Sequence, residues 1–268
     1  RVLNDKNTYN QLELPSGRMA QVKKGDLLAG ALGHRKALFG YSGHLPESLA
    51  PGDQINVLNI GGVLGICDSV NPDLGKPFEC EVLGAVLTFP VLGERIGRPA
   101  RIGGEPLPAE PLLDLKGIPV VAMVGSCMNC GKTAAACALV REFAHQGLRV
   151  DGLKATGVSL RRDILALEDA GARATAIFTD LGVVSTTAKN SAQATRMLLT
   201  RLAAQTALPA QRADLIVLEL GDGLLGAYGV DAILGDPVLR SAFTAVVLAA
   251  SDPLAPRGAI QLLRRDYG

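Results

Sequence analysis

The sequence holds 268 residues, 48% of them hydrophobic, which is enough for one large domain or two ordinary ones. A formal net charge of +1 and the lack of Trp argue against broad electrostatic capture of nucleic acid or an anionic membrane, and against base-stacking surfaces. No apolar run approaches the ~18 residues of a membrane span. The odd number of cysteines, five, does not suggest a disulfide framework, so we expect a reducing, cytoplasmic location.

Residues 1–105 are expected to form a small β-rich domain, either a barrel or a sandwich. Glycine is frequent there, and short apolar segments alternate with turn signals such as Pro51-Gly52-Asp53. Spacing of this order is typical of small antiparallel barrels and sandwiches. The pattern predicts strands at Met19–Val22, Leu27–Leu32, Lys36–Tyr41, Gln54–Ile60, Gly62–Asp68 and Phe78–Leu87.

A segment rich in proline follows, and we expect residues 106–117 to be a linker. Pro106, Pro108 and Pro111 disfavour a regular helix or strand there. From Ile118 onward apolar strands alternate with helices, the pattern of a parallel sheet covered on both faces. Residues 118–268 are therefore predicted to form an α/β domain, truncated at its C-terminus because the chain stops where a predicted helix ends.

The elements of this second domain can be placed along the chain. Strands are predicted at Ile118–Val124, Arg149–Ala155, Ala174–Thr179, Ala213–Leu220 and Thr244–Ala250, the last as a buried strand. Helices are predicted up to His145, over Arg161–Ala170 and Ser191–Ala204, within Val230–Phe243 with a break near Gly235-Asp236-Pro237, and over Arg257–Arg265. Ligands of such a sheet bind outside the carboxyl ends of its strands, so site residues are expected at those ends.

The first strand end carries Gly125-Ser126-Cys127-Met128-Asn129-Cys130-Gly131-Lys132-Thr133, followed by a helix that opens with Ala134. Backbone N–H groups of such a loop and of the first helical turn bind phosphate oxygens. The lysine reaches the β- and γ-phosphates, and the threonine hydroxyl holds Mg²⁺. Residues Gly125–Ala134 are therefore predicted to bind ATP with Mg²⁺, the alternative being a glycine-rich turn that carries Lys-Thr by coincidence.

Two features make this loop unusual. Five residues separate Gly125 from Gly131, where the common phosphate-binding loop (P-loop) has four. Cys127 and Cys130 form a Cys-x-x-Cys pair inside it, for which three interpretations are open. The pair fills a tight loop with small side chains, or it is a redox switch that blocks nucleotide binding, or it ligates a metal or an iron–sulfur cluster. The last needs partners, and the chain has no second Cys-x-x-Cys and only three histidines.

Charged residues follow the next strand ends. Lys154 ends the second strand, where it would place a cation beside the phosphates, and Asp163 opens the following helix. Glu219 ends the strand of residues 213–220, as expected of a second magnesium-binding strand. We predict Lys132 and Lys154 as the catalytic cations, and Thr133, Asp163 and Glu219 as the metal ligands. Asp163 alternatively only complements the helix dipole, and Lys154 is alternatively an exposed strand-end lysine.

The end of the strand that contains Glu219, and the end of the last strand, hold further candidates. Asp222 lies between two glycines after the strand that contains Glu219, and the glycines would allow a ligand to approach closely. Ser251 and Asp252 follow the last strand, where they would contact a nucleotide base or form an ordinary Asp-Pro turn.

Three segments resemble, in order and spacing, the motifs of dethiobiotin synthetase and its relatives. They are the loop, Gly152-Leu153-Lys154-Ala155-Thr156-Gly157 and Glu219-Leu220-Gly221-Asp222-Gly223. That family has a glycine, five residues and Gly-Lys-Thr, then a lysine that contacts phosphate and substrate, then a glutamate that helps to hold Mg²⁺. The resemblance implies these roles for Lys132, Thr133, Lys154 and Glu219. Ser126-Cys127 replaces the family's usual Thr-Asp and Ala155 its proline, so the substrate pocket differs.

Dethiobiotin synthetase lacks a β-rich N-terminal half, and the chain is more similar to bacterial proteins in which such a domain precedes a dethiobiotin-synthetase-like P-loop domain. Some of those proteins are linked to D-amino-acid acylation. The resemblance implies use of the γ-phosphoryl group of ATP on a small carboxylate or amino-acid-like substrate. We expect a homo-oligomer with a small-molecule substrate and with neither nucleic acid nor membrane as partner.

Two other functions stay open. One is a nucleotide-gated switch or metallochaperone-type NTPase, which the lack of a lysine between Gly125 and Gly131 disfavours. The other is an acyl-CoA-dependent transferase, in which the loop holds a pyrophosphate.

Overall fold

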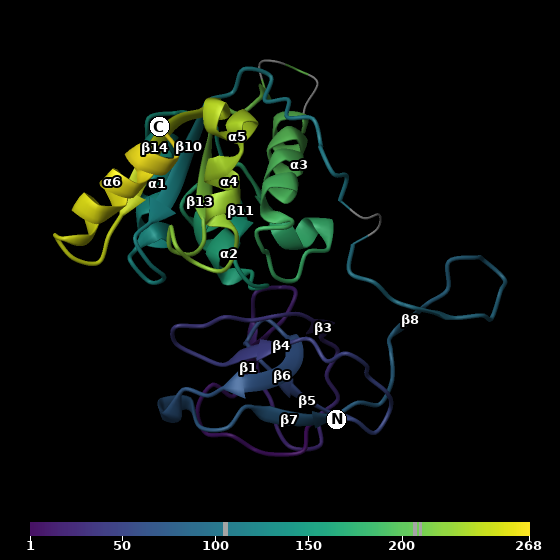
Figure 1. Cartoon of the computed structure of the whole chain (residues 1–268). Helices are drawn as coiled ribbons and strands as arrows, with labels where there is room; N and C mark the ends of the chain where they lie inside the picture. Colours follow the sequence, from purple (N-terminus) through teal and green to yellow (C-terminus); the bar gives the residue numbers. More distant parts are fainter. Residues whose placement is uncertain (104–106, 206–207, 209–210) are drawn as a thin grey trace. The chain divides into compact units, whose positions relative to one another are not determined.

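The computed structural model describes residues 1–103, 107–205, 208 and 211–268, which form two compact units (Figure 1). Unit 1 contains residues 1–103 together with two short segments, Val158–Arg161 and Gly182–Ser185. Unit 2 contains the remainder of the described chain. Residue 106, where the predicted linker begins, lies outside the described residues. None of the helices in the described part is long and apolar enough to cross a membrane.

Unit 2 is built on a five-stranded sheet in which all neighbouring strands run parallel. The order is β12–β11–β13–β10–β14. The strands are β10 (Val120–Gly125), β11 (Val150–Thr156), β12 (Ala174–Ile177), β13 (Leu215–Leu220) and β14 (Phe243–Ala249). Every residue of β11 and β13 is buried, because these central strands are covered on both faces. The predicted α/β domain with a parallel sheet is confirmed.

Helices α1 to α5 of unit 2 form two packed groups. The helices are α1 (Lys132–His145), α2 (Arg162–Asp169), α3 (Ser191–Ala203), α4 (Val230–Gly235), α5 (Pro237–Ala242) and α6 (Ala255–Asp266), with a 3₁₀ turn, η2, at Phe178–Leu181. Helix α1 packs against α2, and α3 packs against α4, which in turn contacts α5. Since β11 is buried throughout and contacts α1, α2 and α3, the two groups cover opposite faces of the sheet.

The predicted break in the helix near residues 235–237 is confirmed. Asp236 accepts hydrogen bonds from the backbone N–H groups of Val238 and Leu239, at 2.9 and 3.1 Å, and so caps the start of α5. Pro237 follows as the first helical residue, where its missing N–H costs nothing.

Strand β14 corrects the expectation of a buried strand at Thr244–Ala250. It lies at the edge of the sheet and pairs only with β10. Residues 244–247 are exposed, and Val246 exposes 46% of its surface. Apolar composition did not reveal this position, because the sequence of β14 is as apolar as that of a buried strand.

Unit 1 contains a sheet of short strands in the order β3–β6–β5–β7, with β4 also paired to β6, and a separate β1–β2 pair. The bounds are β1 (Gln11–Glu13), β2 (Met19–Gln21), β3 (Ala31–Leu32), β4 (Ser42–His44), β5 (Gln54–Val57), β6 (Val63–Ser69) and β7 (Phe78–Glu81), with a 3₁₀ turn, η1, at Pro72–Leu74. The β3–β6 pair is parallel and the other pairs are antiparallel, so the sheet is mixed. A hairpin of β8 (Leu87–Thr88) and β9 (Arg98–Pro99) follows.

The strand predicted at Lys36–Tyr41 is wrong. Arg35 and Gly43 exchange two backbone hydrogen bonds of 2.9 Å, so the residues between them turn back on themselves and the strand begins at Ser42. The predicted strand at Phe78–Leu87 divides into β7 and the first residue of β8.

The two short segments of unit 1 are held by a small apolar cluster. The cluster consists of Tyr41, Leu58 and Val63. Val158 and Val184 pack against it, one from each segment. The side-chain amide of Asn59 donates a hydrogen bond of 2.9 Å to the carbonyl of Ser159. These contacts join sequence-distant parts of the chain within one unit.

Candidate functional site

The predicted phosphate loop joins β10 to α1. The N–H of Ser126 donates a 2.9 Å hydrogen bond to the carbonyl of Ala249 at the end of β14, which fixes the start of the loop. Asn129 and Gly131 adopt left-handed backbone, with φ of 59° and 93°, and the chain then enters α1 at Lys132. Gly131 occupies the N-cap and has no side chain to satisfy the first N–H groups of α1, which suits them to an anion.

Lys132 is buried inside its own loop. Its Nζ donates a 2.8 Å hydrogen bond to the carbonyl of Cys127 and lies 3.6 Å from Sγ of Cys130. A Cβ atom on Gly125 would lie 2.6 Å from both this Nζ and this Sγ. The first glycine of the loop is therefore required so that the lysine and the thiol can lie against the backbone.

Three of the predicted residues meet beside this loop. Glu219 on β13 is in register with Lys154 on β11, so the two side chains lie next to each other at the carboxyl ends of their strands. From the first turn of α1, Thr133 Oγ1 donates a 2.8 Å hydrogen bond to Glu219 Oε1, and Lys154 Nζ lies 3.4 Å from the same oxygen. Glu219 is only 2% exposed, and its second oxygen, Oε2, is buried without a hydrogen-bond partner among the described residues.

Lys154 is a buried cation rather than an exposed strand-end lysine. It is 7% exposed and pairs with Asp163 as well as with Glu219. Burial lowers the pKa of Lys154, but the negative charges of Glu219 and Asp163 outweigh burial and hold the pKa above its ordinary value. A Cβ atom on Gly221 would lie 2.5 Å from the carbonyl of Thr156 and 3.2 Å from Lys154 Nζ, so glycine is needed there.

A divalent cation fits the oxygen atoms of this site. The unpartnered Glu219 Oε2 is a buried carboxylate oxygen, and the Thr133 hydroxyl lies beside the same carboxylate. Hard oxygen donors of this kind suit Mg²⁺, which usually keeps several waters and binds one or two carboxylates together with substrate phosphates. Among the described residues, no group of three or more His, Cys, Asp or Glu could hold a metal by itself.

Asp163 reaches the site through Lys154. Its carboxylate pairs with that amine, and a second oxygen lies 3.8 Å from Nε of Arg162. The interaction positions Lys154, whereas direct ligation of a metal by Asp163 stays a prediction.

Asp222, a further carboxylate candidate, is turned into its own loop. It accepts hydrogen bonds from the backbone N–H groups of Gly223 at 2.7 Å and Tyr228 at 3.2 Å. A Cβ atom on Gly226 would lie 1.9 Å from its Oδ2. Asp222 therefore shapes the loop that follows β13, a role that the sequence did not indicate, and binding of a ligand by Asp222 stays a prediction.

The glycine beside it also has a different role from the expected one. A Cβ atom on Gly223 would lie 2.8 Å from the Cα atom of Cys127. The N–H of Leu224 donates a 2.9 Å hydrogen bond to the carbonyl of Gly125. Gly223 therefore permits close approach of the phosphate-loop backbone, not of a ligand. The sequence did not predict this packing role, because a glycine that contacts a ligand and a glycine that packs against backbone have the same local pattern.

At the end of β14, Asp252 forms a turn. Its Oδ1 accepts hydrogen bonds of 2.9 Å from the N–H groups of Leu254 and Ala255 at the start of α6. These bonds hold the pKa of Asp252 below its usual value. The ordinary Asp-Pro turn is therefore the interpretation that the contacts favour.

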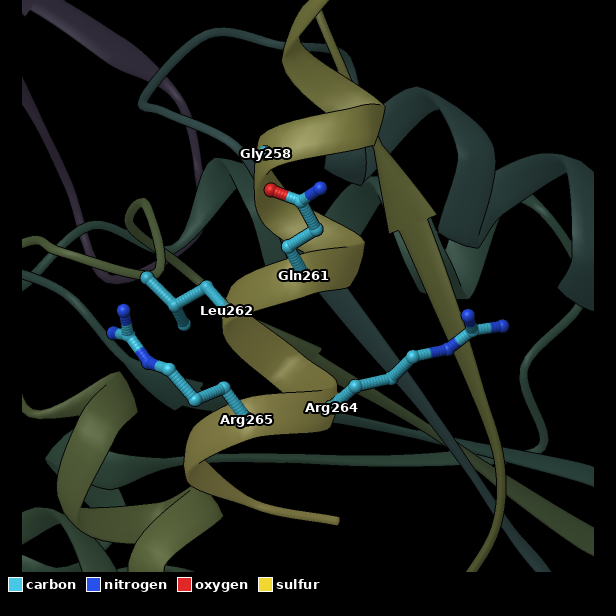
Figure 2. Close-up of a pocket in the computed structure, with 5 residues that line it drawn as sticks. All are labelled: Gly258, Gln261, Leu262, Arg264 and Arg265. Carbon is cyan, nitrogen blue, oxygen red and sulfur yellow. The ribbon is translucent and has the colours of Figure 1, made fainter.

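A surface hollow of about 620 Å³ lies against α6. It is lined by Gly258, Gln261, Leu262, Arg264 and Arg265. Figure 2 shows the two arginine side chains leaving the helix on different sides. None of the lining residues belongs to the phosphate loop or to the ends of β11 and β13, so we do not assign the chemistry to this hollow.

No protein-family model matches the chain, and no curated protein matches it. Among solved structures, the signal recognition particle receptor FtsY from Elizabethkingia anophelis is similar over 57% of this chain and 49% of its own, with 20% identity and a TM-score of 0.37. The chain thus spans about half the length of that receptor. The strand, loop and helix described above have the arrangement of a P-loop domain on their own geometry.

Proposed function

We propose that unit 2 binds a nucleoside triphosphate with Mg²⁺ and is an enzyme that uses the γ-phosphoryl group. The observation that carries the proposal is the unpartnered, buried Glu219 Oε2 beside Thr133 and Lys154. An unsatisfied buried polar atom costs about 1–3 kcal/mol, and more when it is charged. A bound cation removes that cost, which supports a metal-dependent ligand at this edge of the sheet.

The side chains of the site divide the work. Thr133 and Glu219 would hold Mg²⁺, with Asp163 as a further predicted ligand, and Mg²⁺ when bound neutralises charge on the phosphates. The amine of Lys132 would give up its hydrogen bond to the Cys127 carbonyl and donate to phosphate oxygens instead. Lys154, charged and held by two carboxylates, would donate hydrogen bonds to the phosphoryl oxygens on which negative charge develops.

We further propose that the chain belongs with dethiobiotin-synthetase-like P-loop proteins. The support is that the residues of the second and third motifs, Lys154 and Glu219, are in register on neighbouring strands next to the loop. On this basis the acceptor is a small carboxylate or amino-acid-like molecule, the nucleotide is ATP, and the protein is a homo-oligomer.

Isothermal titration of the full chain with ATP, GTP and an acyl-CoA, each with and without Mg²⁺, tests the proposal. We expect triphosphate binding that depends on Mg²⁺, and the ATP and GTP arms report the base preference. Lys132→Ala should abolish binding, whereas Lys189→Ala, which removes an exposed lysine of the same unit, should not. Tight acyl-CoA binding without triphosphate binding would overturn the proposal.

A further inference from the structure

The phosphate loop carries two thiols that the proposed function does not use. Cys127 is half-buried, and Cys130 is buried, with 8% of its surface exposed. Neither forms a disulfide in the structure. Only Met128 and Asn129 separate them, and Asn129 is in the left-handed conformation.

Both cysteines contact the amine of Lys132. Cys127 accepts its hydrogen bond through the backbone carbonyl at 2.8 Å, and the Sγ atom of Cys130 lies 3.6 Å from it. A phosphate would need this same amine. The chemical state of the Cys130 sulfur is therefore linked to the group on which nucleotide binding depends.

The environment of Cys130 differs from that of other cysteines in the chain. Burial raises the pKa of the Cys130 thiol, but hydrogen bonding by the Cys127 backbone and the positive charge of Lys132 outweigh burial, and the pKa lies below its ordinary value. For Cys67, Cys80 and Cys137, burial leads and the pKa is raised. The thiolate, which is the reactive form, is thus favoured inside the phosphate loop.

We propose that Cys127 and Cys130 are a redox modification site whose disulfide closes the phosphate loop to nucleotide. The closing of the loop rests on the proposed function, whereas formation of the disulfide does not. A disulfide holds its two Cβ atoms about 3.5–4.5 Å apart and fixes the torsions of the bridge. That constraint acts on the backbone whose N–H groups have to converge on a phosphate.

A hydroperoxide is the oxidant, and the chemistry takes two steps. The Cys130 thiolate attacks the peroxide, the O–O bond breaks, and Cys130 becomes a sulfenic acid. The alkoxide that leaves (hydroxide, for hydrogen peroxide) takes the proton of the Cys127 thiol. The Cys127 sulfur then attacks the Cys130 sulfur, the S–S bond forms, and hydroxide leaves. The pair loses two electrons and the peroxide gains them. A dithiol reductant restores the thiols by exchange.

Peptide mapping of the full chain tests the modification site. After treatment with hydrogen peroxide and alkylation, we expect a Cys127–Cys130 disulfide, with Cys137 alkylated as a free thiol. Persistent alkylation of both loop cysteines, or a bridge from either one to another cysteine, would overturn the assignment. This measurement does not depend on whether the protein binds nucleotide.

Titration with Mg²⁺ and ATP before and after oxidation tests the closing of the loop. Oxidation should weaken binding at least about tenfold, and dithiothreitol should restore it. A disulfide that leaves the affinity unchanged refutes the switch. Reduced protein that binds no triphosphate overturns the proposed function and the switch with it, while the peptide map still decides the modification site.

Two variants make the test specific. Cys130→Ser should remove the effect of peroxide, read as the ratio of affinities of oxidised and reduced protein within that variant. Cys137→Ser, the matched control on α1, should keep the wild-type ratio. A peroxide effect that survives Cys130→Ser would overturn the proposal. A peroxide effect that disappears in Cys137→Ser would assign the response to Cys137 instead of the loop pair.

Discussion

Thr133 Oγ1 donates a 2.8 Å hydrogen bond to Glu219 Oε1 and so joins the first turn of α1 to β13 across 86 residues of sequence. The bond uses one oxygen of the carboxylate and leaves the other, buried oxygen without a partner among the described residues. The free energy of that arrangement depends on what binds there. A cation would satisfy the oxygen, and the predictions below separate this role from simple structural support.

Glu219→Gln should remove the Mg²⁺ dependence of nucleotide binding. The amide keeps the size of the side chain and can still accept from Thr133, but it does not carry the charge that attracts a cation. We expect affinity in the presence of Mg²⁺ to fall about 10–100-fold, the range for disturbed metal sites, and to change little without Mg²⁺. Paired calorimetric titrations measure this, with Glu142→Gln, an exposed residue of α1, as control. Equal weakening in both conditions would contradict a metal-binding role.

Lys154→Ala should slow turnover more than it weakens binding. Lys132 lies in the phosphate loop, whereas Lys154 lies at the carboxyl end of β11, next to Glu219 on β13. From there Lys154 can act on the phosphoryl group that is transferred. We expect Lys154→Ala to keep much of the triphosphate affinity that Lys132→Ala loses, and to reduce the single-turnover rate. An equal loss of binding in the two variants would argue against the catalytic role of Lys154.

The same substitution has a structural effect that requires its own control. Removing the amine leaves the buried carboxylate of Glu219 and the half-buried carboxylate of Asp163 without their cation, and breaking a buried pair costs about 3–5 kcal/mol. Urea unfolding of Lys154→Ala should show a loss of this order. Adding Asp163→Asn should restore part of it, because one of the two unpaired charges is then gone.

Asp222→Ala should destabilise the fold without altering the Mg²⁺ dependence of binding. The substitution leaves the N–H groups of Gly223 and Tyr228 without the acceptor shown in the structure. We expect a fall of about 1–3 kcal/mol in the free energy of unfolding. Calorimetric titration should show an unchanged ratio of affinities with and without Mg²⁺, in contrast to Glu219→Gln. A change in that ratio would return Asp222 to the metal site.

Asp214 should contribute to the acid sensitivity of unit 2. Hydrogen bonds from the Arg149 side chain and backbone lower its pKa from 3.8 to about 2. Since the folded pKa is below the unfolded one, the stabilisation is complete above about pH 4 and is lost as the pH falls towards 2. Asp214→Asn should cost under ~1 kcal/mol at pH 7, because the carboxylate is partly exposed. Urea unfolding of both proteins from pH 7 to pH 2.5 should show the difference shrinking below pH 4; a difference that does not vary with pH would refute the role of this charge.

The meeting of site residues at the strand ends of unit 2 could be predicted from the sequence, because it follows from a geometry that all parallel sheets share. Parallel strands bring their carboxyl ends to one edge of the sheet, so a lysine and a glutamate that end two such strands are expected to be close. Lys154 and Glu219 meet that expectation. The choice between Glu219 and Asp222 could not be made in this way. Both carboxylates follow the same apolar run, and only the path of the turn directs Asp222 back to its own backbone.

Two other features depended on tertiary pairing. The exposure of β14 follows from its place at the edge of the sheet, and its sequence is as apolar as that of a central strand. In unit 1, the pairing of Arg35 with Gly43 turns an apolar run into a loop. Neither pairing partner is indicated by local composition.

The small apolar cluster of unit 1 matters for the design of expression fragments of this protein. A fragment that starts after residue 106 keeps the whole parallel sheet, but it also takes Val158 and Val184 away from the residues they pack against. The carbonyl of Ser159 likewise loses the amide of Asn59, a partner 100 residues earlier. Cutting the chain there would expose two valines to water, so the protein is best expressed and assayed whole.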